Sequence, residues 1–356
     1  MATMLLSLAC FAFCGAQDDN VLSDVQSFPL PQGGDIHVAF NSTGSHLLVG
    51  GSRPPLAIAD RKVLELEKKF RANVQLLDTE RATAPLLALQ WSAKGPFCVA
   101  LDSDKFMRVW QVDGDRLKAG KPLGVNRYQV HQGLGEYVAV SVHPGGEMLV
   151  SMDKRGVVSL KNSAGVLLPG MLVDTYPRFF HFSRDGSMWC TGTEERLEVF
   201  QFESKEDRQK RYSKREKSKP FASLQLAAPI DGMCWGPPEK RTELAVFSGS
   251  RMHLWNVDPR GAARRELLTA SAESKAQVTA ACFFPDGERL VAGYSDGKLV
   301  VWNTRTCRPI AEKILSSGIV SLDVSSDGGA LAVGCRDGKF SIFWISKAKA
   351  VQQGSK

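Results

Sequence analysis

The chain has 356 residues, of which 43% are hydrophobic and 23% charged, and its formal net charge is +7. This composition is that of an ordinary globular protein, and it excludes a collagen-like, low-complexity or intrinsically disordered chain. The positive charge is local, because residues 205–219 hold eight Lys or Arg and three Asp or Glu, a balance of +5, which leaves about +2 for the rest.

Residues 1–20 form an apolar N-terminal segment. The run from Met4 to Phe13 is apolar, and the first charge is Asp18. Two interpretations stay open: an extra buried strand, which we favour, or a secretory signal sequence without a basic start. The run is too short to span a bilayer as a helix. We expect a cytoplasmic or nuclear protein, with the secretory pathway as the alternative if residues 1–16 are a signal peptide.

An internal repeat organises the rest of the chain. Residues 283–303 and 323–344 read nearly alike, at a spacing of 41 residues without a gap. Each copy contains strands of about five apolar residues joined by Asp-Gly turns, which is typical of antiparallel hairpins. Because such strands are apolar on both faces, each small sheet must be covered on both sides, and stacking sheets around an axis achieves this.

Seven copies can be counted from the glycine of the first turn and the aromatic residue fifteen positions later. They occupy residues 40–60, 92–112, 143–162, 182–202, 236–257, 283–303 and 323–344. The sequence therefore predicts an all-β fold of seven small sheets in one ring over residues 21–346, followed by a basic flexible tail at 347–356.

Three copies end in VWQVDG, LWNVDP and VWNTRT. Together with the Asp-Gly turns, these endings resemble the WD-repeat family of β-propellers over roughly residues 21–346. The resemblance implies a seven-bladed β-propeller with four strands in each blade and a bracing aspartate in each second turn. Asp296 and Asp337 match that aspartate directly, and Asp104 matches it less securely. The family's Gly-His dipeptide is absent from all seven copies, so we expect the blades to depend more on apolar packing.

The last copy is one strand short, because a basic polar tail follows it. Residues 21–28 precede a turn rich in Pro and Gly and can supply the missing strand. The family resemblance implies the same arrangement, in which an N-terminal strand closes the last blade.

The basic segment, residues 205–219, lies between the third and fourth strands predicted for the fourth blade. We therefore expect it to protrude on the face that carries the first and third turns. Three interpretations of the segment stay open. The one we favour is a solvated loop that is partly helical or disordered. The others are a nuclear-localisation or phosphate-contacting patch, and a contact for an acidic partner. Tyr212 is its only aromatic residue, which weakens a base-stacking role. Its candidate contact residues are Lys210, Arg211, Lys214 and Arg215.

The sequence predicts neither metal binding nor catalysis. The cysteines lack the paired short spacings of a zinc site, and Cys98, Cys190, Cys282 and Cys335 fall on or beside predicted strands, where we expect reduced, buried thiols. His143 takes a first-turn position and is expected to be structural. No nucleophile elbow, kinase signature or strand-to-helix phosphate loop is present. We expect a protein that is not an enzyme and has no cofactor.

The remaining function is that of a binding platform. In a rigid ring, the second turns are expected near the rim of the central channel. The candidate partner-binding residues there are Arg155, Glu194, Glu195, Arg251, Tyr294 and Arg336, with Ser250 beside them. We expect a scaffold for other proteins, monomeric within a hetero-complex, whose basic segment contacts an acidic protein or RNA.

Two alternative functions stay open. The stretches LLDTERATAPLLALQW and VSLDVSSDGGALAVG faintly resemble the propeller-type guanine-nucleotide exchange factors that act on a small GTPase at the start of COPII vesicle formation. We expect no counterpart here of that family's extended glycine-rich loop or C-terminal membrane anchor. The second alternative, a component of a nuclear ribonucleoprotein assembly, rests on the basic segment alone.

Overall fold

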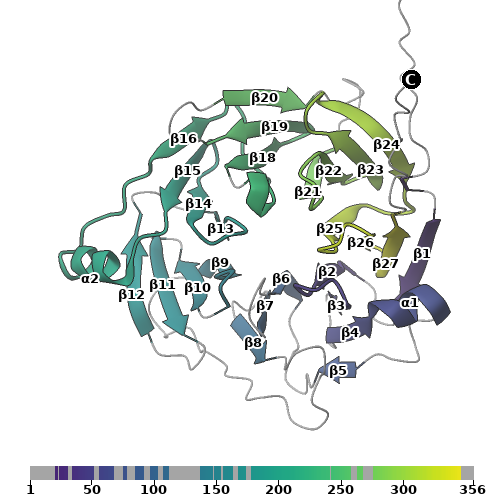
Figure 1. Ribbon diagram of the computed structural model, residues 1–356, viewed down its shortest axis with the longest axis horizontal. Coiled ribbons are helices and arrows are strands. Elements are labelled where there is room, and N and C mark those ends of the chain that lie inside the picture. The colour runs from purple at the N-terminus through teal and green to yellow at the C-terminus, as the bar shows by residue number, and fades with distance from the viewer. Residues whose placement is uncertain are drawn as a thin grey trace, which may run out of the picture.

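The strands of the protein form a ring of antiparallel sheets around a common axis (Figure 1). The computed structural model describes residues 21–345 except 23, 31–33, 52–55, 68–74, 78–84, 92–96, 103–106, 112–136, 147, 154, 163–166, 174–177, 241, 258–262 and 268–275. We number the sheets one to seven by the chain order of their innermost strands. The expectation of an all-β propeller is confirmed.

The first four sheets follow one another along the chain. Sheet one consists of β2 (His37–Phe40), β3 (His46–Gly50), β4 (Leu56–Asp60) and β5 (Gln75–Leu77), and sheet two of β6 (Leu86–Trp91), β7 (Phe97–Asp102) and β8 (Met107–Gln111). Sheet three consists of β9 (Tyr137–Val142), β10 (Met148–Asp153), β11 (Val157–Asn162) and β12 (Leu167–Leu172), and sheet four of β13 (Phe179–Phe182), β14 (Met188–Gly192), β15 (Arg196–Gln201) and β16 (Ala222–Gln225).

Three further sheets complete the ring. Sheet five consists of β17 (Gly232–Trp235), β18 (Glu243–Ser248), β19 (Arg251–Asn256) and β20 (Ala263–Leu267), and sheet six of β21 (Val278–Phe283), β22 (Arg289–Tyr294), β23 (Lys298–Asn303) and β24 (Arg308–Ile314). Sheet seven consists of β25 (Ile319–Val324), β26 (Ala330–Cys335), β27 (Lys339–Trp344) and the N-terminal strand β1 (Asp24–Pro29).

The number of complete blades differs from the prediction. Six sheets have four strands, so the structure shows six complete blades rather than seven. The remaining sheet, β6–β8, has three strands, and the residues that follow it, 112–136, lie outside the described part of the chain. The inner strands nevertheless contact one another in sequence around the whole ring, from β2 through β6, β9, β13, β17, β21 and β25 back to β2.

The two ends of the described chain meet in sheet seven, as predicted. β1 pairs antiparallel with β27 over six residue pairs, from Asp24–Trp344 to Pro29–Lys339. The hydroxyl groups of Ser27 and Ser341 lie 2.7 Å apart, and the rings of Phe28 and Phe340 stack at 5.1 Å. An N-terminal strand therefore closes the last sheet.

Apolar clusters fill the spaces between neighbouring sheets. Six clusters of buried side chains occur, and each joins two sheets that are adjacent in the ring. Alternate residues of one strand serve different clusters: Leu290 and Ala292 of β22 pack toward sheet five, whereas Val291 packs toward sheet seven. The two apolar faces inferred from the sequence are thus both buried.

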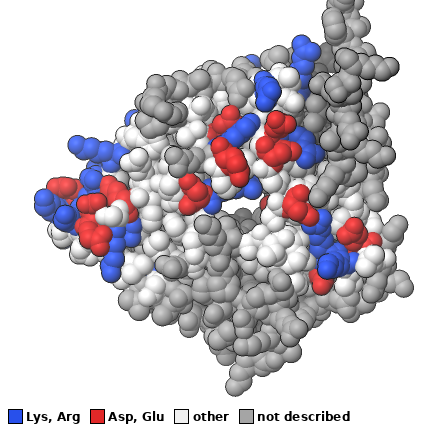
Figure 2. All heavy atoms as spheres, in the orientation of Figure 1, with Lys and Arg blue, Asp and Glu red and all other residues white. Residues whose placement is uncertain are grey.

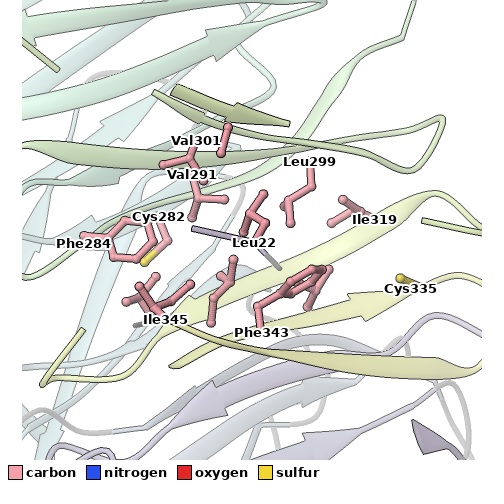
Figure 3. Close-up of a cluster of buried hydrophobic side chains, with 14 residues drawn as sticks. Leu22, Cys282, Phe284, Val291, Leu299, Val301, Ile319, Cys335, Phe343 and Ile345 are labelled. Atoms are coloured by element: carbon pink, nitrogen blue, oxygen red, sulfur yellow. The ribbon is translucent and has the colours of Figure 1, made fainter. Parts of the chain in front are cut away.

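The N-terminal end of the chain contributes to the junction between sheets six and seven. Leu22 is 3% exposed and lies among the side chains of Leu299, Ile319, Phe343 and their neighbours (Figure 3). It therefore fastens the closing strand by apolar contact in addition to the hydrogen bonds of β1.

Two α-helices interrupt the outer parts of two sheets. α1 (Arg61–Glu67) lies between β4 and β5, and α2 (Lys205–Ser213) lies between β15 and β16, where the basic segment was placed from the sequence. A short 3-10 helix, Pro238–Lys240, forms the first turn of sheet five. Among the described residues, no helix has the length and apolar character needed to cross a bilayer. The predictions for residues 1–20 and 347–356 lie outside the described residues.

Shortening Leu22 should test the closing strand. We expect Leu22→Ala to lower the free energy of unfolding by about 3 kcal/mol, because it leaves a cavity between sheets six and seven. Leu66→Ala is the matched control, since Leu66 is 81% exposed and its loss should cost less than about 0.5 kcal/mol. Urea unfolding followed by tryptophan fluorescence measures both, and equal effects of the two substitutions would contradict the role of Leu22.

Candidate functional site

The second turns, which join the second and third strands of a sheet, carry most of the predicted contact residues. Arg155 lies between β10 and β11, Glu194 and Glu195 between β14 and β15, and Arg336 between β26 and β27. All four are exposed. Because the strands of a sheet alternate in direction, their second turns lie on the same face of the ring.

Several of these side chains already have partners within the chain. Arg155 donates through Nε and Nη2 to Asp153 Oδ2 at 3.1 and 3.0 Å, while Asp153 Oδ1 accepts the amides of Arg155 and Val157. Glu194 pairs with Arg178 at 3.3 Å, but both side chains are more than half exposed, so solvent screens the pair. The glutamates are therefore more available to a partner than Arg155.

Tyr294 departs from the expectation of an exposed contact residue. It is the last residue of β22 rather than part of the turn, and it pairs with Val278. Its side chain is 4% exposed and packs in the cluster between sheets five and six. Burial raises the pKa of Tyr294 to about 12. Arg251, by contrast, begins β19 and is exposed, and Ser250 in the turn before it is half-buried.

The aspartates of the second turns act locally. Asp296 Oδ1 accepts the amide of Lys298 at 3.0 Å, and Asp337 accepts the amide of Lys339 and the hydroxyl of Ser316 at 3.3 and 3.1 Å. The bonds to Lys298 and Lys339 fix the turns themselves, and the bond to Ser316 joins the second turn of sheet seven to the connection between β24 and β25. Asp104 lies outside the described residues.

Polar side chains link neighbouring sheets at the first turns, on the opposite face. Lys240 Nζ of sheet five donates to Gly287 O of sheet six at 2.8 Å, and His143 Nε2 of sheet three lies 3.2 Å from Gly186 O of sheet four. The Gly145 amide donates to His143 Nδ1 at 3.1 Å, so Nε2 carries the proton and donates to Gly186. The structural role expected for His143 agrees with these contacts.

Sheets one and seven are linked by an ion pair on the same face. Arg61 Nη1 at the start of α1 lies 2.8 and 2.9 Å from the two carboxylate oxygens of Asp327. Partial burial alone would raise the pKa of Asp327, but hydrogen bonds from Arg61, Ser325 and Gly329 outweigh it and lower the pKa to about 2. The carboxylate is therefore ionised at neutral pH.

A belt of mostly polar residues lines one level of the inner strands. The penultimate residues of the seven inner strands, here called the polar belt, are Ala39, Gln90, Ser141, His181, Cys234, Cys282 and Asp323. Asp323 Oδ2 accepts the Phe40 amide of sheet one at 2.7 Å, and Gln90 Oε1 accepts the Val142 amide of sheet three at 3.2 Å. Since the inner strands of neighbouring sheets form no ladder, these side chains satisfy backbone groups between them.

Arg184 contacts one member of this belt, Cys282, from two sheets away. From the first turn of sheet four, its Nη2 donates to Phe283 O at 3.3 Å and to Cys282 Sγ at 3.4 Å in sheet six, passing sheet five. Burial raises the pKa of Asp323 above its ordinary value and that of Cys282 to about 11.

The thiols and histidines form no metal centre in the described part of the chain. No group of three or more His, Cys, Asp or Glu side chains there has the proximity that a metal ion needs. Cys98, Cys190, Cys282 and Cys335 are buried on strands, as predicted. Their burial agrees with the interpretation of these cysteines as small apolar side chains.

The basic segment is a seated helix rather than a free loop. Ser204 caps α2, because its hydroxyl accepts the Asp207 amide at 3.1 Å. Arg208 is 5% exposed, and its guanidinium lies 4.5 Å from the ring of Phe202, which packs against His143 at 4.9 Å. The segment also reaches sheet three, where the Ser218 amide donates to Leu172 O at 2.7 Å.

The cations of the basic segment divide into two groups. Arg208 is buried, and Arg211 forms a two-point ion pair with Glu203 at 2.7 and 3.1 Å, so both hold the helix in place. Arg211, one of the candidate contact residues, is partly buried and makes this ion pair within the segment. Lys210, Lys214 and Arg215 are exposed. The positive charge that the segment presents to a partner is therefore smaller than its count of Lys and Arg suggests.

The sequence pattern did not single out Asp323, Arg184 or Arg208 as residues that link sheets or hold a helix. One signal was present for Asp323, which occupies the position of Cys282 in the preceding copy and is a carboxylate inside an apolar strand. Arg184 and Arg208 look like ordinary surface cations in the sequence. The partners of Arg184 lie in sheet six, far along the chain, and Arg208 contacts Phe202 and Glu203 only because the segment after β15 folds back on itself.

Replacing Asp327 should remove a pH-dependent contribution to the stability. We expect Asp327→Asn to destabilise the ring at pH 7 by less than about 1 kcal/mol, as for a partly exposed ion pair. The folded pKa is about 2 against an ordinary value of 3.8, so the stabilisation is complete above pH 4 and is lost as the pH falls toward 2. Urea midpoints measured across this range should converge for the two proteins.

Arg61→Gln provides the control for Asp327. In that background the Asp327→Asn substitution should have a smaller effect, because the principal partner is already absent. An undiminished effect would contradict the link between sheets one and seven.

Replacing Arg208 should loosen α2. We expect Arg208→Ala to speed amide hydrogen exchange in residues 205–213 about tenfold, although alanine is the better helix former, because the contacts with Phe202 and the Glu203 carbonyl are lost. Lys210→Ala is the matched control and should leave the exchange rates near those of the wild type. Similar exchange in both variants would show that Arg208 does not hold the helix.

The comparisons with known proteins agree with this architecture. Residues 265–303 match the family model described as WD domain, G-beta repeat, and they cover most of sheet six. No curated protein matches the chain. The repeat match and the propeller arrangement together support a WD-repeat β-propeller family for this chain.

Proposed function

We propose that the protein is a non-enzymatic scaffold that holds other proteins within a larger assembly, itself present as a single copy. WD-repeat propellers fit an interaction role in general and are typically not enzymes. The observation that carries the proposal is the unbroken succession of contacts between inner strands around the ring. Because the frame is packed on all sides, its turns are held in fixed positions, and a partner loses little free energy in ordering them.

The proposal includes a seventh blade. Sheet two lies between sheets one and three in the ring, and Leu48, Ile58, Cys98 and Ala100 pack in one cluster between sheets one and two. A seventh blade agrees with the seven copies of the repeat.

The face of the second turns is the proposed platform for partners. Glu194, Glu195, Arg251 and Arg336 are exposed there, and Arg155 keeps about half of its side chain exposed beside Asp153. Carboxylates and guanidinium groups at separate positions around the channel can recognise a partner of mixed charge. The resemblance to exchange factors of a small GTPase, a place in a nuclear ribonucleoprotein assembly, and the compartment stay predictions.

Charge reversal on the two faces tests the platform. We expect the triple variant Glu194→Arg, Glu195→Arg, Arg336→Glu to lose at least three quarters of one or more partner proteins in quantitative affinity purification of the tagged full chain. The control is Arg305→Glu on the third-turn face, whose side chain is 83% exposed, and it should retain them. Unchanged recovery by the triple variant would rule out the second-turn face.

Two further outcomes would overturn the scaffold itself. The first is a wild-type ring that enriches no protein over an unrelated propeller used as bait. The second is nucleotide release from a small GTPase accelerated by the purified chain, which would favour the exchange-factor alternative.

A further inference from the structure

We propose that the outer rim beside α2 is a docking surface for a short acidic segment of a partner protein. This inference rests on the proposed scaffold function and adds a second contact away from the channel. The α2 surface consists of Lys205, Lys210, Tyr212, Lys214, Arg215 and Lys219, all of them exposed. Lys and Arg gather around α2 at the left edge of the ring, with a few acidic residues among them (Figure 2).

The α2 surface is preorganised. Arg208, Arg211 and the Ser218 amide fix the segment to Phe202, Glu203 and Leu172. A ligand would therefore meet a formed helix rather than a loop that must first become ordered, which reduces the entropy lost on binding.

The exposed cations of the α2 surface are poorly neutralised. Lys205, Lys210, Arg215 and Lys219 form no ion pair with any described residue, and Lys214 approaches Glu216 only to 4.0 Å with both side chains more than half exposed. Lys210 and Lys214 are four residues apart at the helix end, a spacing at which like charges repel. An acidic ligand would relieve this repulsion.

Arg215 is the most informative residue of the surface. Its φ is 56°, in the left-handed region, and it directly follows the C-terminal cap Lys214. The Glu216 amide donates to Arg211 O and the Arg215 amide to Tyr212 O, the pattern that ends many helices with glycine at this position. A residue with a side chain costs about 1 kcal/mol there. An arginine at a position that favours glycine indicates that its charge is used.

Tyr212 adds an apolar anchor to the charged surface. It is 41% exposed, one of four large hydrophobic side chains with such exposure in the described part of the chain. Its ring lies over Gly170 of β12, where a Cβ atom would come within 3.6 Å of Tyr212 Cε2. A half-exposed tyrosine beside lysines suits an acidic segment that carries one aromatic or aliphatic residue.

The arrangement favours a protein partner over a nucleic acid. Glu206, Asp207 and Glu216 are exposed among the cations, and a uniform polyanion would meet all three. A peptide can place its carboxylates only where the cations stand. Sequence-tolerant binding of single strands needs several stacking aromatics, and Tyr212 is the only aromatic residue in residues 205–219.

The direct test uses the full chain and a fluorescent twelve-residue peptide with six Glu or Asp and one Phe. We expect binding by fluorescence anisotropy at 50 mM salt that weakens as the salt concentration rises. Arg215→Gly should weaken binding two- to fivefold while the thermal midpoint stays equal or rises, because glycine relieves the strained backbone. A purely structural role for Arg215 predicts unchanged binding.

A matched pair of triple variants locates the surface. Lys210→Glu, Lys214→Glu, Arg215→Glu should weaken binding at least tenfold. Arg305→Glu, Arg308→Glu, Lys313→Glu removes the same number of exposed cations from sheet six and should change it less than twofold. Equal losses, or no peptide binding by the wild type, would overturn the proposal, and so would tighter binding of an oligouridine of equal charge.

The outcome is separable from that of the proposed function. Loss of the α2 surface should leave the partners held by the second-turn face in affinity purification. Failure of the peptide test with those partners retained would remove only the acidic docking surface, whereas failure to enrich any protein would remove the scaffold.

Discussion

Every sheet of this protein has two apolar faces and can bury both only between two other sheets. β22 shows the constraint within three residues, because Leu290 and Ala292 pack toward sheet five while Val291 packs toward sheet seven. A single sheet of this kind would expose both apolar faces to water, which costs more than its few strand hydrogen bonds supply. Each sheet is therefore stable only within the ring and would not be stable alone.

Closure follows from the same constraint and is placed at the two ends of the described chain. Ser27 and Ser341 are 314 residues apart in sequence and adjacent in sheet seven. Apolar contact through Leu22 and the ion pair of Arg61 with Asp327 hold the same region from two other sides. Polar links through Lys240, His143 and Asp323 join neighbouring sheets. The bracing network implied by the family resemblance would instead act within each blade. Stability therefore depends on contacts that are distant in sequence, and such topologies fold slowly.

The sequence predicted the turns and strands, which local patterns determine. It did not predict the contacts between residues that only the folded ring brings together. Asp-Gly turns and alternating apolar residues were sufficient for the propeller, for the closing strand and for the position of the basic segment, because hairpins and strand faces are local properties. The burial of Tyr294 and the hydrogen bonds of Arg184 to sheet six depend on neighbours from other sheets, and the ion pair of Arg211 with Glu203 depends on how the segment after β15 folds back. The prediction of seven complete blades went further than the structure, in which the sheet β6–β8 has three strands.

Charge indicates a binding surface in this protein only after the buried cations have been separated from the exposed ones. Arg208 and Arg215 belong to one short segment, yet one guanidinium lies over Phe202 and the other is exposed at a position that favours glycine. A cation that improves packing has a sufficient structural reason for its presence. A cation that strains the backbone and contacts no acidic group of the described chain has none, and its charge is available to a partner. Because the sheets are held by contacts among themselves, the rim can carry such residues without weakening the frame that positions them.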